Sequence, residues 1–289
     1  MRAGRYRAVI HGLGGRASLP ATNVAARRAG IPFVLWASLW AHPRTPAHLL
    51  SLVPTRHLYR NADAVVTYGP HVSRYVERFR GTRGNVFEAP QAVSAAEFGA
   101  PAEPRRLAHG FELLFAGRLE REKGVEVLLE AWRLAALGED AALVIAGEGP
   151  IDPQAAGVHV LGRVPRDELP ALYAGADALV LPSIRTATFL EPWGLVVNEA
   201  MHQGTPVIAS NAVGAVAGGL VRDGRNGLVA PAADPRALAT RIQTLARDRG
   251  LRERLGAAAR EDVQAYSETA WVAGMRRALE AVDAGKAGG

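Results

Sequence analysis

The chain has 289 residues, of which 48% are hydrophobic and 21% charged, a composition that supports a sizeable core and argues against global disorder. It contains no cysteine, which excludes disulfides, thiol catalysis and thiolate metal sites. Neither a signal peptide nor an uncharged stretch long enough to span a bilayer is recognisable, so a cytoplasmic location is expected.

The net charge of +6 is unevenly distributed along the chain. Residues 1–110 carry 15 Lys and Arg against 5 Asp and Glu, a net charge of +10, whereas the remainder has a net charge of −4. A basic half indicates either an anionic partner or an arginine-rich solvated surface. No basic stretch interleaved with aromatic residues is present, so nucleic acid is not expected as a partner. If the partner is anionic, lipid headgroups or phosphates remain, and the membrane hypothesis is a peripheral position at the inner face of an anionic membrane.

In the first part of the chain, short apolar runs alternate with helical patterns. Residues 6–12, 31–37 and 62–69 are predicted to be buried strands, and residues 21–30 a helix that ends at Gly30. Residues 81–110 are rich in Gly, Pro, Ala and charged residues, and are predicted to be a linker. About three strands are few for a self-sufficient layer, so this first domain is expected to be incomplete.

A second and nearly complete series follows the predicted linker. Its predicted strands are 111–117, 141–149, 158–162, 176–183, 205–210 and 226–230. Its predicted helices are 124–137, 166–175, 195–203, 234–247 and 251–265. Strands that alternate with helices indicate parallel sheets covered on both faces, the Rossmann-like arrangement, in which ligands bind at the carboxyl ends of the strands.

The segment "GLGGRA", Gly12 to Ala17, fits the G-x-G-x-x-A pattern of dinucleotide-binding turns. That fingerprint also requires an acidic residue near the end of the next strand to hold a ribose. None follows "IPFVLWA", because the first acidic residue of the chain is Asp63. The alternative is a tight turn in which glycines allow close backbone approach. Binding of NAD, but not of UDP or GDP, would favour the dinucleotide interpretation.

The segment "FAGRLEREKG" places Arg118 and Lys123 five residues apart, after a strand and before a helix. A guanidinium and an ammonium at the carboxyl end of a strand can bind one phosphate group together. Glu120 and Glu122 lie alongside and could pair with these cations instead, in a solvated turn. The spacing alone leaves both alternatives open.

Glu191 and Glu199 are the only acidic residues of the apolar stretch "LEPWGLVVNEAMHQGTPVI". Buried carboxylates are costly unless they are paired, so both lie at the surface or face a polar ligand. Pro192 and Gly194 place Glu191 in a loop and start a helix near Gly194 or Leu195. Glu199 then lies about one turn inside that helix, whose positive N-terminus faces the same strand ends as Arg118.

Three segments together resemble the retaining glycosyltransferases of family 4, the glycosyl transferases group 1, which have the GT-B fold. They are "AGRLEREKG" (116–124), "VHVLGRVPRDELPALYAGADALVLPS" (158–183) and "EPWGLVVNEAMHQGTPVIAS…GGLVRDGRNGLVAP" (191–231). The resemblance covers residues 111–250 closely. It implies an α/β fold of two Rossmann-like domains that face a cleft, with sugar transferred from a nucleotide sugar to an acceptor hydroxyl with retention of configuration.

The resemblance also implies roles for individual residues. Arg118 and Lys123 match the pair that binds the donor diphosphate, and Glu191 matches the glutamate that faces the donor sugar; these three form the expected catalytic set. Glu199 matches the residue that holds the ribose hydroxyls. The expected donor-binding set is Gly117, Gly162, Arg163, Val164, Trp193, Gly194, Leu195, Val196 and Glu199. Within it, residues 162–164 match the loop against which the base packs, and residues 193–196 the segment under the sugar and phosphate.

The implied chemistry is front-face attack, in which the leaving phosphate helps to take the proton of the acceptor. Fixed cations and a helix N-terminus stabilise the departing diphosphate, so that no cofactor, metal or protein nucleophile is expected. The expected partners are a UDP- or GDP-linked sugar and a glycan or lipid-linked acceptor, such as a cell-envelope precursor.

The sequence departs from the family in three places. Ala217 and Gly218 stand where a glutamate is common, and residues 36–38 stand where the first domain usually has a histidine. His42 is the nearest histidine and could substitute for it, or be incidental. The early strands of the first domain have no counterpart, so the first sheet is expected to expose an edge and to make the chain self-associate.

The expected domains are a partial acceptor-side domain over residues 1–106, a donor domain over 107–266, and a final helix over 267–289. That helix, capped by Ser267, is expected to pack back toward the first domain. The leading hypothesis is an active glycosyltransferase. The alternative is a nucleotide-sugar-binding subunit that is inactive alone and needs a partner or an upstream segment.

Overall fold

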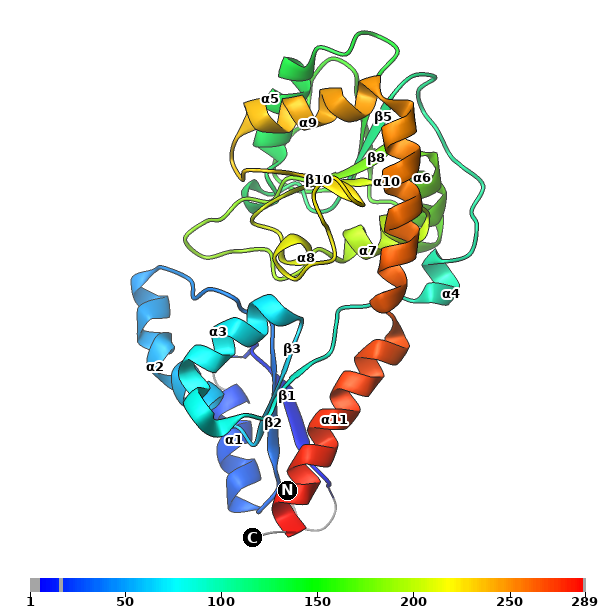
Figure 1. Cartoon of the computed structure of the whole chain (residues 1–289). Helices are drawn as coiled ribbons and strands as arrows, with labels where there is room; N and C mark the ends of the chain where they lie inside the picture. The colour runs from blue at the N-terminus through cyan, green and yellow to red at the C-terminus, as the bar shows by residue number, and fades with distance from the viewer. Residues whose placement is uncertain (1–5, 16–17, 288–289) are drawn as a thin grey trace. The chain divides into compact units, whose positions relative to one another are not determined.

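The computed structural model describes residues 6–15 and 18–287 of the chain (Figure 1). The chain divides into two compact units. The first unit comes from Met1–Gln91 and Glu268–Gly289, and the second unit is Ala92–Ser267. The sequence placed the first boundary after residue 106, some fifteen residues later than the boundary between these units.

The shift of the boundary has a physical cause in residues 92–106, which pack on the second unit. The side chain of Gln203 donates hydrogen bonds to the carbonyl groups of Phe98 and Ala100, the latter over 2.9 Å. The main-chain N–H of Arg105 donates to the carbonyl of Ala171 over 2.9 Å. These polar and Gly/Pro-rich residues are therefore an ordered part of the second unit and not the predicted linker.

The first unit is built on a parallel sheet of strand order β1-β2-β3-β4 within the described residues. Its strands are β1 (Val9–Gly12), β2 (Phe33–Ala37), β3 (Ala64–Thr67) and β4 (Val86–Glu88). Its helices are α1 (Ser18–Arg28), α2 (Pro46–Asn61), α3 (Pro70–Arg80) and α11 (Glu268–Ala287), with a 3-10 turn, η1, at Gly81–Arg83. The prediction of about three strands was wrong by one, because β4 lies inside the expected linker.

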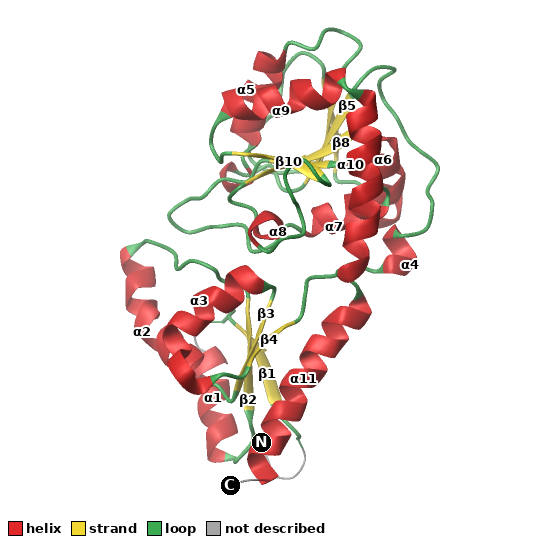
Figure 2. Cartoon of the chain, viewed as in Figure 1, coloured by secondary structure: helices red, strands yellow, loops and turns green. Residues whose placement is uncertain are grey.

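Alternation along β2 divides the core of this unit between the two faces of its sheet, as the two-residue period of a strand requires. Phe33 and Leu35 face one side, where they pack with buried residues of α1, α2 and α3. Val34 faces the other side, where it packs with Met275 and Ala278 of α11. The last helix, which begins directly after Ser267, thus covers one face of the first sheet, and Figure 2 shows helices around the strands of each unit.

The second unit has a parallel sheet of order β10-β9-β8-β5-β6-β7 in the described residues. Its strands are β5 (Glu112–Ala116), β6 (Ala142–Ala146), β7 (Val158–Gly162), β8 (Ala178–Leu181), β9 (Val207–Ser210) and β10 (Gly227–Ala230). Its helices are α4 (Ala95–Phe98), α5 (Val125–Ala135), α6 (Leu169–Gly175), α7 (Leu195–His202), α8 (Gly214–Ala217), α9 (Pro235–Arg247) and α10 (Arg249–Asp262). Three 3-10 turns complete it: η2 (Arg121–Lys123), η3 (Arg166–Glu168) and η4 (Val263–Ala265).

All six predicted strands of this series are present. Four of them, β5, β6, β8 and β9, are fully buried, and such parallel strands have near-continuous apolar sequences that are easy to recognise. Odd-numbered residues of β5 and β6 and even-numbered residues of β8 and β9 pack against α5 and α9. The alternate residues, among them Leu114 and Val144, are buried on the other face, to which α6 and α7 contribute. Among the described helices, none is both long and apolar enough to cross a bilayer.

Candidate active site at the β5/β8 switch point

The strand order of the second unit reverses between β5 and β8. Strands β6 and β7 follow on one side of β5, whereas β8, β9 and β10 lie on the other. In open α/β sheets, ligands bind outside the carboxyl ends of the strands at such a switch point, since the two following loops diverge there. The loop after β5 contains Arg118 and Lys123, and the loop after β8 contains Glu191.

Two glycines allow these loops to approach closely. Gly124 has a φ of +75°, and a Cβ at this position would lie 2.1 Å from the carbonyl oxygen of Pro182, just after β8. A Cβ on Gly147, after β6, would lie 1.8 Å from the carbonyl oxygen of Gly117. Any larger residue would push the loops apart, so both glycines are required by the packing of this edge. The sequence analysis singled out Gly117 but not Gly124 or Gly147.

Lys123 and Glu191 meet directly at the switch point. The Nζ of Lys123 donates to Oε2 of Glu191 over 2.6 Å, and the hydroxyl of Ser183 donates to the same oxygen over 2.9 Å. Glu191 is only 5% exposed. A carboxylate this deeply buried requires such partners, because its desolvation is otherwise very costly.

The backbone of Glu191 is held as firmly as its side chain. Its carbonyl oxygen accepts a hydrogen bond from the N–H of Gly214 over 3.0 Å, and it forms an isolated parallel bridge with Val213. Four residues later, α7 begins at Leu195 with Gly194 as its N-cap residue, where the sequence predicted a helix start. The positive end of α7 is therefore fixed at the same edge as Lys123.

Glu199 lies on the second turn of α7 and has different partners. Its Oε2 accepts a hydrogen bond of 2.6 Å from the hydroxyl of Tyr173, a fully buried residue of α6. Its Oε1 lies 3.7 Å from the guanidinium of Arg166, which also forms an ion pair of 2.6 Å with Glu97 and stacks over the ring of Phe98. Arg166 thus connects Glu199 to α4.

Burial raises the pKa of Glu199, and neither the hydrogen bond from Tyr173 nor the charge of Arg166 fully opposes this effect. Burial, together with the negative charge of Glu199, also raises the pKa of the Tyr173 hydroxyl well above its usual value. Tyr173 therefore stays protonated and donates. Glu199 is left as a poorly solvated hydrogen-bond acceptor, which favours a ligand that brings hydroxyl groups to it.

Arg118 is more exposed than its predicted partner Lys123. Its guanidinium forms an ion pair of 2.5 Å with Glu120 and a longer one of 3.7 Å with Glu122, and its side chain is 57% exposed. These are the alternative partners that the sequence suggested. Lys123 instead turns toward Glu191, so the two cations have separate carboxylate partners in this structure.

The remaining predicted residues fall into two groups. Gly162 ends β7 with a φ of +66°, and it is followed by the exposed Arg163 and the half-buried Val164, at the same carboxyl edge. Trp193 is 2% exposed, and its indole N–H donates to Asn198 over 2.7 Å. The indole ring of Trp193 is thus part of the core. If Trp193 contacts a ligand, it can do so only through its main chain.

On α7 itself, Leu195 is exposed and Val196 half-buried, so both can contact a ligand at the helix start. The sequence analysis missed Ser183, Tyr173 and Arg166, the side chains that hold the two glutamates. Each lies in the quoted segment 158–183, but the spacing of residues gives no indication that they contact Glu191 and Glu199.

The dinucleotide interpretation of "GLGGRA" gains no support from the first unit. Gly12 ends β1, and Arg16 and Ala17 lie outside the described residues. Asp63, the first acidic residue, accepts a hydrogen bond of 2.7 Å from the main-chain N–H of Phe33. It therefore has a structural role between β2 and β3.

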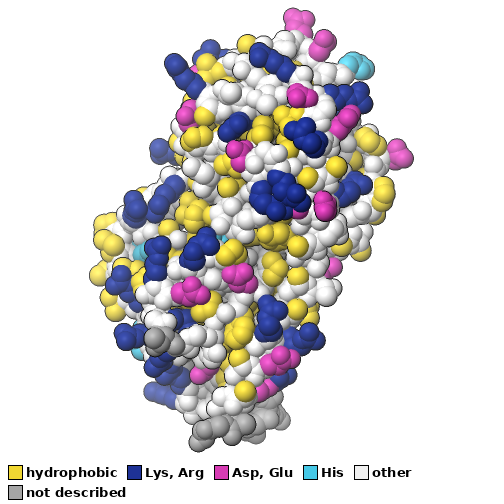
Figure 3. All heavy atoms as spheres, viewed as in Figure 1, with side chains coloured by type: hydrophobic (Ala, Val, Ile, Leu, Met, Phe, Trp, Pro, Cys, Tyr) yellow, Lys and Arg dark blue, Asp and Glu magenta, His cyan; other side chains and the backbone are white. Residues whose placement is uncertain are grey.

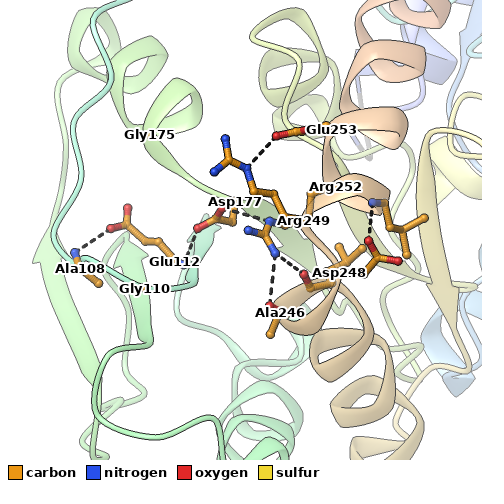
Figure 4. Close-up of polar contacts among 12 residues, drawn as sticks. Ala108, Gly110, Glu112, Gly175, Asp177, Ala246, Asp248, Arg249, Arg252 and Glu253 are labelled. Carbon is orange, nitrogen blue, oxygen red and sulfur yellow. Dashed lines mark hydrogen bonds and ion pairs between the residues drawn. The ribbon is translucent and has the colours of Figure 1, made fainter.

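The opposite edge of the second sheet also has a pocket, of about 650 Å³, lined by several charged residues. Arg252 contacts Asp177 at 3.1 Å, as Figure 4 shows, and Arg106 contacts the same carboxylate at 2.8 Å. Glu112 accepts hydrogen bonds from the main chain of Leu107 and Ala108. The charges of this network neutralise one another and fix residues 105–110, which favours a structural role. Over the described residues, no cluster of His, Asp and Glu suited to a metal ion is found.

Comparisons with known proteins identify the family of the chain. Residues 106–262 match the family described as "Glycosyl transferases group 1". An uncharacterized glycosyltransferase of Methanocaldococcus jannaschii is 33% identical over 169 residues, 55% of this chain and 41% of that protein. The phosphatidyl-myo-inositol mannosyltransferase of Mycobacterium leprae is 35% identical over 182 residues, 60% of this chain and 47% of that protein. The chain spans about half the length of the curated relatives it matches.

Solved structures resemble the chain over nearly its whole length. HepE of Anabaena, in complex with UDP and glucose, superposes with a TM-score of 0.76 at 20% identity, over 94% of this chain and 77% of that one. Sucrose-phosphate synthase of Thermosynechococcus elongatus superposes with a TM-score of 0.70 at 24% identity, over 92% and 77% of the two chains. At these identities the likeness concerns the fold.

Proposed function

The chain belongs to the glycosyl transferases group 1 family, and we propose that it transfers a sugar from a nucleotide-sugar donor to an acceptor hydroxyl. Its two-unit α/β fold is of the GT-B type, as the sequence predicted. Membership of the retaining family 4, retention of configuration and transfer of a hexose are parts of this proposal. They rest on the motifs around Arg118, Lys123, Glu191 and Glu199.

The observation that carries the proposal is the buried contact between Lys123 and Glu191 at the switch point. It places an ammonium group and a carboxylate side by side, next to the positive end of α7. A nucleotide sugar carries a diphosphate beside a ring of hydroxyls, which are the groups that a cation and a carboxylate bind.

The proposed chemistry places the donor diphosphate against Lys123, Arg118 and the start of α7. As the sugar–phosphate bond breaks, negative charge develops on the leaving diphosphate, and these groups stabilise it. The carboxylate of Glu191 accepts hydrogen bonds from the sugar, and Ser183 keeps that carboxylate in place. The leaving phosphate takes the proton of the acceptor hydroxyl, so that no side chain has to act as the nucleophile.

Glu199 is proposed to bind the ribose of the nucleotide. Its carboxylate is short of solvation and has one oxygen committed to Tyr173. The two neighbouring hydroxyls of a ribose can donate to the other oxygen. The loop 162–164 after β7 would then pack against the base. HepE was solved with UDP and glucose, which supports a UDP-linked donor here, with GDP as the alternative base.

The acceptor is proposed to be anionic, either a lipid-linked molecule or a glycan precursor of the cell envelope. Residues 1–91, which belong to the first unit, have a net charge of +10. Two relatives are named for phosphorylated inositol acceptors, the mannosyltransferase of M. leprae and a D-inositol 3-phosphate glycosyltransferase of Corynebacterium diphtheriae. A peripheral position on an anionic membrane surface would bring a lipid-linked acceptor to this unit.

The proposal is tested by measuring transfer from a panel of UDP- and GDP-linked sugars to alkyl-phosphate and inositol-phosphate acceptors, with and without EDTA. We expect one donor to be used, with the anomeric configuration of the donor kept in the product and the rate unchanged by EDTA. Donor binding without transfer to any acceptor would instead favour the alternative of a nucleotide-sugar-binding subunit. Binding of NAD in the absence of UDP or GDP binding would contradict the proposal.

A further inference from the structure

The first unit contains an apolar pocket of about 640 Å³, a size typical of small-molecule sites. The pocket lies where the loops after β1 and β2 meet α2. Leu13 lines it after β1, Leu39 lines it after β2, and Leu58 lines it from α2. The pocket therefore opens at the carboxyl edge of the first sheet, the edge at which ligands of parallel sheets bind.

One polar atom in the lining has no partner. Nε2 of His42 lies 2.6 Å from the carbonyl oxygen of His48, and because that oxygen can only accept, Nε2 carries the hydrogen. In the neutral ring, Nδ1 is then a hydrogen-bond acceptor, and it is buried without a partner among the described atoms. A buried acceptor without a partner is costly. Nδ1 is closed to solvent in this structure, so His42 is fixed in the wall by its bond to His48, and the pocket offers a ligand chiefly apolar contacts.

The charge beside the pocket favours an anionic ligand over a cationic one. No Asp or Glu is among its lining residues. Arg44 follows directly on Pro43, which lines the pocket, and both Arg44 and Arg56 are exposed. An anionic headgroup would be attracted to this surface, and a cationic one repelled.

The mouth of the pocket continues into an exposed apolar ridge on α2. Leu50, which lines the pocket, is 81% exposed, and Leu49 and Val53 are 60% and 72% exposed. Figure 3 shows hydrophobic side chains gathered at its left edge, over α2 in the shared view, with Lys and Arg beside them. Large apolar side chains rarely cluster in solvent without a binding role.

We infer that this pocket holds the aliphatic chain of an anionic amphiphile. The aliphatic chain packs against the leucines of the lining, and Arg44 and Arg56 attract the negative charge of the headgroup. The identification of this amphiphile with the acceptor rests on the proposed function. Binding of the aliphatic chain does not depend on the proposed function, because the pocket belongs to the first unit and the proposed donor site to the second.

The test is a calorimetric titration of the full chain with butyl phosphate and octyl phosphate, below the concentration at which the latter forms micelles. Each buried methylene strengthens binding by about fourfold, so we expect octyl phosphate to bind about 10²-fold more tightly. Ser51→Phe places a phenyl ring in the pocket and should abolish this difference. Leu50→Ser should weaken octyl phosphate binding several-fold. Leu107→Ser makes the same change at an exposed leucine of the second unit, outside the lining, and should leave this binding unchanged.

Equal affinity for the two phosphates, or undiminished binding of octyl phosphate by a folded Ser51→Phe variant, would overturn the inference. A dimer of the chain that Ser51→Phe dissociates would also overturn it, because the pocket would then hold a second copy. Binding of UDP is measured in parallel in every variant. Loss of UDP binding with the chain-length dependence intact would contradict the proposed function alone. Retained UDP binding without any dependence on chain length would contradict this inference alone.

Discussion

Lys123 is the residue on which the proposed chemistry depends most. Its ammonium group is held at 2.6 Å from Glu191 and lies 5.4 Å from the ring centre of Phe189, so it is positioned before any ligand binds. Lys123→Ala would remove a transition-state contact and leave the buried carboxylate without its cation. We expect kcat/KM for transfer to fall by roughly 10²–10³-fold.

For Arg118→Ala we expect a loss of kcat/KM in the same range. The guanidinium of Arg118 can leave Glu120 and Glu122 when a diphosphate binds. Arg133→Ala is the matched control. Arg133 forms an exposed ion pair with Glu130 on α5, and an exposed pair of this kind contributes little. Unchanged kcat/KM in both site variants would rule out the assignment of the diphosphate site.

Glu199→Gln is expected to stabilise the protein while it weakens ligand binding. Burial raises the pKa of Glu199 in the folded state, so folding opposes ionisation of this carboxyl group. The folded protein therefore binds a proton at Glu199 more readily than the unfolded chain does. As the pH falls from above the folded pKa to the unfolded pKa, the wild-type protein becomes more stable, and as the pH rises it becomes less stable. A neutral amide removes this cost.

Thermal unfolding between pH 4 and pH 8 measures this effect. We expect the Tm of Glu199→Gln to exceed that of the wild type at pH 8, with the difference disappearing near pH 4, where the unfolded carboxyl group titrates. A Tm below that of the wild type throughout would mean that the contact with Tyr173 outweighs the desolvation of the carboxylate.

At the level of single residues, the sequence drew attention to the two glutamates but not to the side chains that hold them. Glu191 and Glu199 stand out because they are the only carboxylates in an apolar stretch. Ser183 and Tyr173 are ordinary residues of a buried strand end and a helix, and only the fold brings them to the carboxylates. The buried side chain of Trp193 could not be predicted for the same reason.

The loops after β5 and β6 form one element of the site, and their contact depends on Gly147. Gly147→Ala would place a methyl group 1.8 Å from the carbonyl oxygen of Gly117, a distance that no relaxation of side chains can relieve. We expect the variant to lose nucleotide affinity by at least tenfold and to unfold at lower temperature. We expect the free energy of unfolding to fall by about 1–3 kcal/mol, as it does when a core is overpacked.

Gly250→Ala provides the control for this prediction. Gly250 lies in the first turn of α10, and a Cβ there would meet only the side chain of Asp248 at an ordinary 3.5 Å. Alanine favours the helix by up to about 1 kcal/mol. Equal nucleotide affinity and equal Tm in the two variants would show that the contact between the loops is dispensable.

At the level of elements, the sequence predicted the second unit far better than the first. Fully buried strands such as β5 and β6 are recognisable as apolar runs. Strand β4 has only three half-buried residues, and it was taken for part of a linker. Helix α2 was missed because Leu49, Leu50 and Val53 expose apolar side chains to solvent and hide the helical period.

For the whole molecule, the basic first unit predicts attraction to anionic bilayers. We expect the chain to cosediment with vesicles that contain anionic lipid, at about 1 kcal/mol for each basic residue near the surface, and to be released by salt. Vesicles of neutral lipid are the control. Cosedimentation that is independent of both anionic lipid and salt would contradict an electrostatic origin.

The central claim is that the second unit binds a nucleotide sugar at the β5/β8 switch point, and calorimetry of the full chain tests it most directly. The titrations use UDP, GDP and the corresponding sugar nucleotides, with the wild type, Glu191→Ala and Glu199→Ala. The account predicts that Glu199→Ala weakens both the free nucleotide and its sugar derivative, whereas Glu191→Ala weakens only the sugar derivative. Equal losses for the nucleotide and its sugar derivative in both variants, or no binding of either nucleotide by the wild type, would contradict it.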